Sequence, residues 1–150
     1  MRLSQQAQYA ICGMFDLAYN GESAPVQVRV IGERQRIPPR YLEQIFQRLR
    51  RADLVRGKRG PGGGYVLARE PRAITLRDIV EAVEGPLADG LAAGPPPRER
   101  RLAHRPNFLW LDLCGRIESA LGEVSLEEVC RRAAAVAVRR AGADRRTYHI

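Results

Sequence analysis

The sequence predicts a mainly α-helical protein with one small β-hairpin, and three observations point to this fold class. Apolar residues recur at helical spacing over residues 4–19 and 40–51. A glycine-rich segment, Arg56–Tyr65, lies between two short strand-like runs. A further apolar stripe, over residues 107–121, follows a stretch rich in Gly, Ala, Pro and Arg. A chain of 150 residues is long enough for one domain with a buried core and an appended helix.

The first half of the chain predicts three helices in succession. The first covers residues 4–19, and Ser4 is a suitable cap for it. A short second helix over residues 26–35 follows a turn. The pair Pro38-Pro39 opens the third helix, over residues 40–51, because proline fits a first helical turn whose N–H groups have no partner. Its outer face carries Arg40, Glu43, Gln44, Gln47, Arg48 and Arg51.

The segment Arg56–Tyr65 predicts a two-stranded hairpin. Its glycines adopt positive φ without a Cβ penalty, and Pro61 fixes its own φ near the value that turns require. The tip is expected to present Arg56, Lys58 and Arg59 with few bulky side chains around them. Such a tip suits close approach to a sugar-phosphate backbone or a narrow groove. Taken alone, the segment also fits an exposed hairpin whose charges only keep the chain soluble.

The surplus of positive over negative charge lies almost entirely in one region. Residues 29–59 contain ten Lys or Arg against three acidic residues, which gives this region +7 of the total net charge of +8. A local surplus of this kind indicates a polyanionic partner, and nucleic acid fits better than a membrane surface because no long amphipathic helix with bulky apolar anchors is present. Helix, helix, turn, helix and basic hairpin describe a winged helix-turn-helix. Its third helix would enter the major groove, and its hairpin, the wing, would reach an adjacent minor groove or phosphate.

The rest of the chain predicts an appended helical part. Thr75 caps a helix that runs through Val83, and the segment Leu87–Arg101 is interpreted as a loop without apolar periodicity. The long helix over residues 107–121 has little to pack against in so small a domain, which favours dimerisation. Ser125 opens a last helix with a capping box. We therefore expect a DNA-binding domain over 1–86, a loop over 87–105, dimerisation and C-terminal helices over 106–138, and a flexible basic tail over 139–150.

Several separated motifs together carry a family resemblance. They are Met1-Arg2-Leu3-Ser4 with Tyr9-Ala10, Tyr41-Leu42-Glu43-Gln44-Ile45-Phe46 with Leu49-Arg50, Arg59-Gly60-Pro61-Gly62-Gly63-Gly64-Tyr65, Ile74-Thr75-Leu76 with Asp78-Ile79, and Glu81-Ala82-Val83-Glu84-Gly85-Pro86. The chain resembles the bacterial winged-helix regulators related to the iron–sulphur cluster regulator and the nitric-oxide-sensing repressor (IscR/NsrR-like, Rrf-type). The resemblance is dense over residues 1–86, and Trp110-Leu111-Asp112-Leu113 resembles the family's dimerisation helix.

The resemblance implies a homodimeric transcription regulator, most often a repressor, that binds double-stranded DNA at imperfect palindromes. It implies major-groove contacts from Arg40, Tyr41, Glu43 and Gln44, and minor-groove contacts from Arg59 with the Pro61-Gly62 turn. The chemistry agrees, since Glu43 can accept from cytosine, Gln44 can pair with adenine and Arg40 can address guanine or phosphate. The remaining predicted DNA-contacting residues are Arg29, Arg48, Arg51 and Lys58. Arg48, Arg50 and Arg51 are interpreted as backbone-positioning charges or as a solvated face.

Many members of this family hold an iron–sulphur cluster on three cysteines in the loop before the dimerisation helix. Here the segment Leu87–Arg101 contains no cysteine, so the usual cluster site is not expected. The hypothesis that remains is a metal, cluster or redox site across the dimer, formed by Cys12 of one subunit with His104 or Cys114 of the other. The alternative is that both cysteines are small apolar core residues and the protein has no cofactor.

Other classes of function fit the sequence less well. The two histidines, His104 and His149, belong to no recognisable nucleophile–base set, and the glycine-rich segment lacks the Lys-Ser/Thr of a phosphate loop, so an enzyme is not expected. A winged-helix protein-interaction module would not need the basic cluster, whereas a regulator controlled by a ligand or protein partner stays open. Three widely spaced cysteines, no signal-like start and no long apolar run lead us to expect a cytoplasmic protein.

Overall fold

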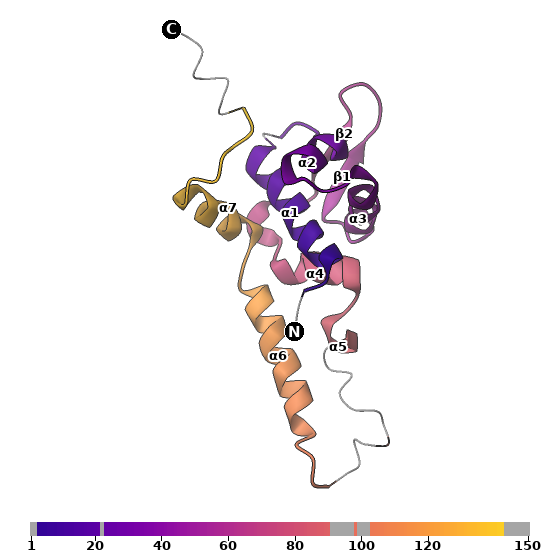
Figure 1. The fold of residues 1–150 in the computed structure, drawn as a ribbon, viewed down its shortest axis with the longest axis vertical. Coiled ribbons are helices and arrows are strands. Elements are labelled where there is room, and N and C mark those ends of the chain that lie inside the picture. The colour runs from indigo at the N-terminus through magenta and orange to yellow at the C-terminus, as the bar shows by residue number, and fades with distance from the viewer. Residues whose placement is uncertain (1–2, 22, 91–97, 99–102, 143–150) are drawn as a thin grey trace.

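The computed structural model describes residues 3–21, 23–90, 98 and 103–142. Within these residues the chain is mainly helical with one two-stranded antiparallel sheet, as predicted (Figure 1). The elements are α1 (Gln5–Asn20), α2 (Val28–Gln35), α3 (Pro39–Arg51), β1 (Val55–Lys58), β2 (Gly64–Leu67), a 3₁₀ turn η1 (Pro71–Ala73), α4 (Leu76–Glu84), α5 (Leu87–Gly90), α6 (Phe108–Gly122) and α7 (Leu126–Ala135).

Helix starts coincide with capping side chains. The Ser4 hydroxyl accepts from the Ala7 N–H at 3.1 Å and caps α1. Thr75 and Asp78 form a reciprocal capping box at the start of α4, with the two bonds at 3.1 and 2.9 Å. Ser125 caps α7 through the Glu128 N–H at 3.1 Å. These side chains satisfy N–H groups that a helix start would otherwise leave without partners, which is why the predicted starts lie close to the observed ones.

The hydrophobic core surrounds α1. This helix packs against α2, α3, α4 and α7, and its residues Ala7, Ala10 and Met14 are fully buried. The apolar stripe of α3 closes the core from the side opposite its polar face through Leu42, Ile45, Phe46 and Leu49. A core of this kind holds α3 rigidly, so that its outer face is presented in a fixed orientation.

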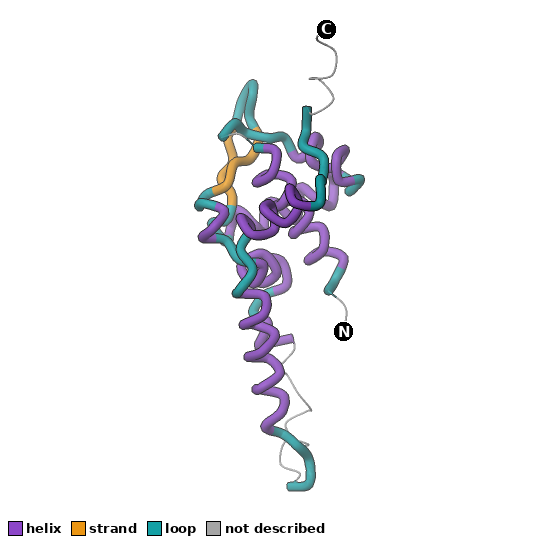
Figure 2. Tube along the Cα trace, turned by 90° about the vertical axis from the view of Figure 1, so that its left-hand side faces the viewer, coloured by secondary structure: helices purple, strands orange, loops and turns teal. Residues whose placement is uncertain are grey.

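Helix α6 extends away from the rest of the molecule, as the two perpendicular views show (Figures 1 and 2). Its inner stripe, Trp110, Cys114, Ile117 and Leu121, is buried or half-buried against its own chain, with contacts to α4 and α5. The exposed large apolar side chains of the helix are Phe108 (75%), Leu111 (74%) and Leu113 (40%). The stripe chosen from the sequence therefore faces the domain, while these side chains are exposed.

Two segments differ from their predictions. The first four residues of the expected loop form the short helix α5, in which Leu87 is buried and its N–H donates to Glu81 Oε1 at 3.3 Å. The expected flexible tail contacts α1 in its described part. Arg140 Nη1 donates to the Tyr19 carbonyl at 3.0 Å, and the Arg140 guanidinium lies 4.2 Å from the Tyr19 ring centre. Residues 143–150, including His149, lie outside the described residues.

No described helix combines the length and the apolar character that crossing a membrane requires.

Candidate nucleic-acid interface

The outer face of α3 is open to solvent. The sequence-predicted side chains Arg40, Glu43, Gln44 and Arg51 are all exposed, and Tyr41 is 61% exposed despite its apolar ring. Pro39 occupies the first helical position, as proline-rich starts predict. The face thus combines guanidinium, carboxylate, amide and phenol groups on one rigid helix, which is the chemistry that recognises base edges and phosphates.

The wing is a β1–β2 hairpin in the register Val55↔Leu67 to Lys58↔Gly64. Its tip, Arg59–Gly63, is exposed at Arg59, Pro61 and Gly62, and Gly60 and Gly62 adopt φ of 92° and 72°. Gly64 is the position where glycine is required: its φ is 147°, and an added Cβ would lie 2.5 Å from the Val26 carbonyl carbon and oxygen. That close approach allows Val26 and Tyr65 to exchange backbone hydrogen bonds of 2.9 and 2.8 Å. The wing is therefore fixed to the chain just before α2.

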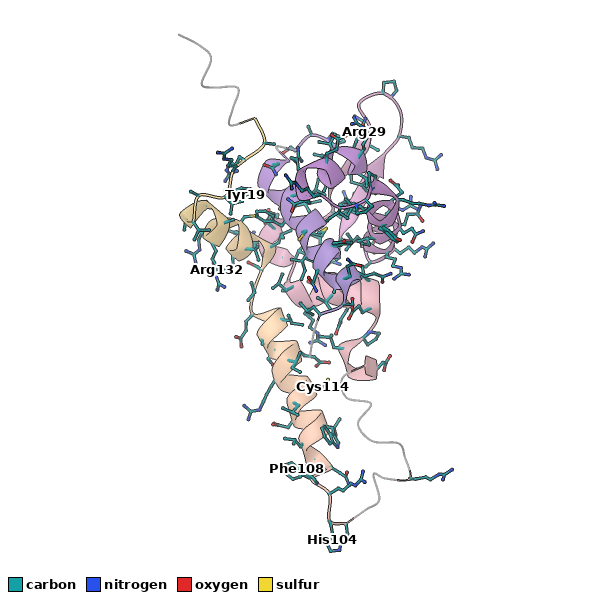
Figure 3. The ribbon with its side chains drawn as sticks, in the orientation of Figure 1. Tyr19, Arg29, His104, Phe108, Cys114 and Arg132 are labelled. Carbon is teal, nitrogen blue, oxygen red and sulfur yellow. The ribbon has the colours of Figure 1, made fainter. Side chains whose placement is uncertain are left out.

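A cleft of about 470 Å³ lies between the start of α2, the face of α3 and the wing. Its walls carry four cationic side chains, Arg29, Arg50, Lys58 and Arg59, against the single carboxylate of Glu43. Figure 3 places Arg29 beside the hairpin, at the opposite end of the molecule from His104. A concave surface with this charge attracts a polyanion such as a phosphate backbone.

Tyr65 lines the same cleft and was not assigned a binding role from the sequence. Its ring contacts Phe46 with centres 5.1 Å apart, which joins the wing to the core. Burial and the Glu43 carboxylate raise the pKa of the Tyr65 hydroxyl, opposed in part by Arg50. The hydroxyl therefore stays protonated, and it can donate to an anion. The position of Tyr65 in a strand did not indicate a binding role, because that role depends on how the hairpin packs against α3.

A second, smaller cleft of about 170 Å³ separates the first turns of α1 and α3. It is lined by polar side chains from both helices, among them Gln5, Tyr9, Tyr41 and Gln44. Gln5 Nε2 donates to the Tyr9 hydroxyl at 2.9 Å. The apolar spacing of α1 indicated only a core helix, so the position of Gln5 on the polar surface beside Gln44 was not predicted.

Two of the predicted DNA-contacting arginines have partners within the protein. Arg48 Nη1 donates to the Val83 carbonyl at 3.0 Å and to Gln6 Oε1 at 2.9 Å. Its guanidinium therefore links α3 to α1 and α4. Arg48 is nevertheless exposed and lines the second cleft beside Gln44, so its contact with DNA stays a prediction. Arg29 pairs with Glu33 at 2.7 Å, but both side chains are 63% exposed, so this pair costs little to open.

The three candidate sensor residues are not brought together within one chain. Cys12 is half-buried on α1, Cys114 is buried on α6, and His104 precedes α6 at its far end (Figure 3). Burial raises the pKa of the Cys12 thiol, and burial together with the Glu118 carboxylate raises that of Cys114. Iron–sulphur clusters are held mainly by thiolates, and both shifts disfavour the thiolate. In the described part of the chain, no group of three His, Cys, Asp or Glu side chains could hold a metal ion. The residues of a single protomer therefore do not fit the family's cluster.

An exposed polar helix, a basic wing and a cationic cleft between them define a winged-helix DNA-binding protein. The chain belongs to the Rrf2 family, whose model, described as an iron-dependent transcriptional regulator, matches residues 3–132. It is a DNA-binding transcription regulator of the IscR-like group, which confirms the resemblance drawn from the motifs.

Relatives support this assignment over most of the chain. The HTH-type transcriptional regulator IscR of Xenorhabdus nematophila is 40% identical over 138 residues, covering 87% of this chain and 80% of the relative. Among solved structures, T. potens IscR superposes with a TM-score of 0.75 at 30% identity and covers 99% of this chain and 97% of its own. The structure of CymR, the global cysteine regulator of B. subtilis, superposes with a TM-score of 0.69 at 29% identity, covering 88% of this chain and 98% of its own.

Proposed function

We propose that the protein is a homodimer that recognises a two-fold-related, imperfect palindromic operator, with one half-site per protomer. The observation that carries this proposal is the cationic cleft between α2, α3 and the wing, next to the exposed face of α3. A phosphate strand that follows this cleft would place α3 in the major groove and the wing tip in the adjacent minor groove.

Base recognition is assigned to the first turns of α3. Gln44 would pair with an adenine edge, Glu43 would accept from a cytosine amino group, and Arg40 would address guanine or phosphate. Arg59, with the Pro61-Gly62 turn, would enter the minor groove. Lys58 and Arg51 would contact phosphates and fix the register without selecting a sequence.

Dimerisation is assigned to α6. Phe108 and Leu111 are about three-quarters exposed on a helix that already extends beyond the domain. Exposed large apolar side chains on one element favour burial against a partner, and a second copy satisfies this with two-fold symmetry. The two DNA-binding domains would then be held at a fixed separation.

Two modes of control of DNA binding are considered. A site shared across the dimer, in which Cys12 meets His104 or Cys114 of the partner subunit, is retained as a hypothesis. The raised pKa of both thiols favours the second candidate, a regulator controlled by a ligand or a protein partner without a resident cluster. Removing Cys12 and Cys114 together without changing metal content or operator affinity would support that second candidate.

The DNA-binding proposal is tested by comparing two single variants on DNA selected from a random library. We expect Gln44→Ala to lose preference at one half-site position, by about 1–3 kcal/mol, because only a base contact is removed. Lys58→Ala should weaken all sequences alike and lower the salt slope by about one, because a phosphate contact releases counterions. Equal losses of Gln44→Ala on selected and random DNA would contradict the placement of α3 in the major groove.

A further inference from the structure

The C-terminal end of helix α6 is attached to the DNA-binding domain by backbone hydrogen bonds. Directly after its C-terminus, the chain pairs with the start of α4: the Leu76 N–H donates to the Val124 carbonyl at 3.0 Å, and the Leu126 N–H donates to the Ile74 carbonyl at 2.8 Å. These two backbone bonds form a bridge between Thr75 and Ser125. From this end α6 extends outward (Figures 1 and 2), and its direction depends on the contacts along its side, which include the apolar stripe against α4 and α5.

A group of polar side chains joins the side of α6 to α4. Arg77 of α4 lies 3.1 Å from Glu81 Oε1 through its Nε and 3.5 Å from Glu118 Oε2 of α6 through its Nη2. The other Glu118 oxygen, Oε1, accepts from Cys114 Sγ at 3.6 Å. We call Arg77, Glu81, Glu118 and Cys114 the α4–α6 brace. Both Glu118 oxygens are thus engaged, one from each helix.

The brace joins two helices, α4 and α6, whereas nearby ion pairs lie within one element or beside it. Arg116 and Asp112 pair at 2.9 Å within α6, and Arg72 and Glu70 pair at 2.6 Å beside η1. Neither of these pairs fixes the direction of one helix against another. The Arg77 side chain is 42% and the Glu118 side chain 22% exposed, so the pair contributes little to the stability of the fold. It is, however, an ion pair between side chains of α4 and α6, and it adds a polar contact to the apolar packing of the inner stripe.

Small changes of this angle have large consequences at the far end of the helix. The fifteen residues of α6 span about 22 Å at 1.5 Å per residue. A rotation of about 10° at the fixed end therefore displaces the Phe108 end by about 4 Å. One base pair adds about 3.4 Å along DNA, so this displacement is of the size that separates adjacent half-site spacings.

We propose that the α4–α6 brace sets the spacing and orientation of the two half-sites that the dimer accepts, with Arg77 and Glu118 as positioning residues that do not touch DNA. The inference rests on the proposed function, in which α6 holds two DNA-binding domains together. The Arg77 guanidinium fixes the angle of each protomer's α6, and the dimer contains the brace twice.

The test measures binding of the full-length protein to three DNA probes and to a single half-site. The probes carry the selected palindrome and the same palindrome with one base pair added or removed at its centre. For Arg77→Met and Glu118→Ala, we expect discrimination between the natural and altered spacings to fall about two- to fivefold. The fall is limited because an added base pair also rotates the half-sites. Single half-site affinity should stay unchanged, and Arg72→Met, which removes an arginine from an ion pair outside the brace, should match the wild type.

Each outcome decides between the proposals. Wild-type discrimination in both brace variants, with dimers and helical content intact, would overturn the brace while leaving the palindrome proposal in place. A change in only one of the two variants would also overturn it, because the Arg77–Glu118 contact is lost in both. Equal wild-type affinity for a single half-site and for the palindrome would overturn the proposed function, and the brace inference with it.

Discussion

At the scale of single residues, Asp16 is unusual because it is a charged side chain in the core. It is fully buried on α1, and its carboxylate accepts from Arg34, which forms a close ion pair with it, and from Gln35 Nε2 at 3.0 Å. Both partners come from the last turn of α2. Asp16 thereby fixes the first helix of the helix-turn-helix to the central helix of the core, immediately before the chain turns into α3.

We expect Asp16→Ala to lower the free energy of unfolding by about 2–4 kcal/mol. Breaking a buried pair leaves a guanidinium without its counter-charge, and the Arg34 side chain is 28% exposed, so water relieves only part of the cost. Urea denaturation followed by circular dichroism measures the change. Glu33→Ala is the matched control on the partner helix: it opens the exposed Arg29–Glu33 pair and should cost under about 1 kcal/mol. Similar losses for the two variants would show that burial does not set the strength of the Asp16 pair.

The hydrogen-bond partners of Arg48 could not be predicted from the sequence. Its place on the polar face of α3 cannot be distinguished by pattern from that of Arg51, and both residues are exposed. Its hydrogen bonds to Val83 and Gln6 join residues 35 and 42 positions apart in the chain. Helical spacing places a side chain on a face, but the partner across the fold depends on packing that no local pattern encodes.

At the scale of elements, local signals predicted most of the helices. The predicted third helix, over 40–51, differs from α3 by one residue, because proline at a first helical turn and a terminal cluster of arginines mark its ends. The second helix starts two residues later than predicted, because Val26 pairs with Tyr65 of the wing. The elements that were missed, α5 and the segment after α7, are held by contacts from other parts of the chain and carry little periodicity of their own.

The segment after α7 is fixed to the end of α1 by several weak contacts. The Tyr19 hydroxyl donates to the Val138 carbonyl at 2.7 Å, and the Ala141 N–H donates to Asn20 Oδ1 at 2.7 Å. Arg140 adds its bond to the Tyr19 carbonyl and its contact with the Tyr19 ring. A cation at the C-terminal end of α1 also complements the helix dipole.

We therefore expect Arg140→Ala to lower the free energy of unfolding by about 1 kcal/mol, since it removes one hydrogen bond and one cation–π contact. The neighbouring exposed Arg139 is the matched control, and Arg139→Ala should change the value by less than about 0.5 kcal/mol. Denaturant midpoints of the two variants, measured side by side, check this. No difference between them would mean that the tail is flexible from Arg139 onward, as the sequence suggested.

At the scale of the whole molecule, the two functions proposed for the chain lie at opposite ends. The cationic cleft and wing occupy one end, and the outer part of α6, with Phe108, extends to the other (Figure 3). Residues 29–59, which hold most of the net charge, are also those that form the polar face of α3 and the first strand of the wing. Charge clustering in the sequence therefore predicted which elements line the cationic cleft, and their contact with DNA stays a prediction. Helix α6 was also predicted, but the sequence does not show which of its sides α4 covers, and its predicted stripe lies against its own chain.

The choice of stripe leads to a prediction about assembly. Leu111→Glu should raise the dimer dissociation constant by about a hundredfold or more, because a two-fold interface loses two buried leucines and gains two carboxylates. Sedimentation velocity over a concentration series measures this, with circular dichroism to show that the helices persist. Val136→Glu is the matched control, since Val136 is 75% exposed against 74% for Leu111 but lies at the end of α7. Equal dissociation of the two variants would point to a general effect of added charge, and an intact Leu111→Glu dimer would place the interface away from this face of α6. If Leu111→Glu removes the dimer, Val136→Glu does not, and single half-site binding is retained, DNA recognition and assembly are separate functions located at opposite ends of the molecule.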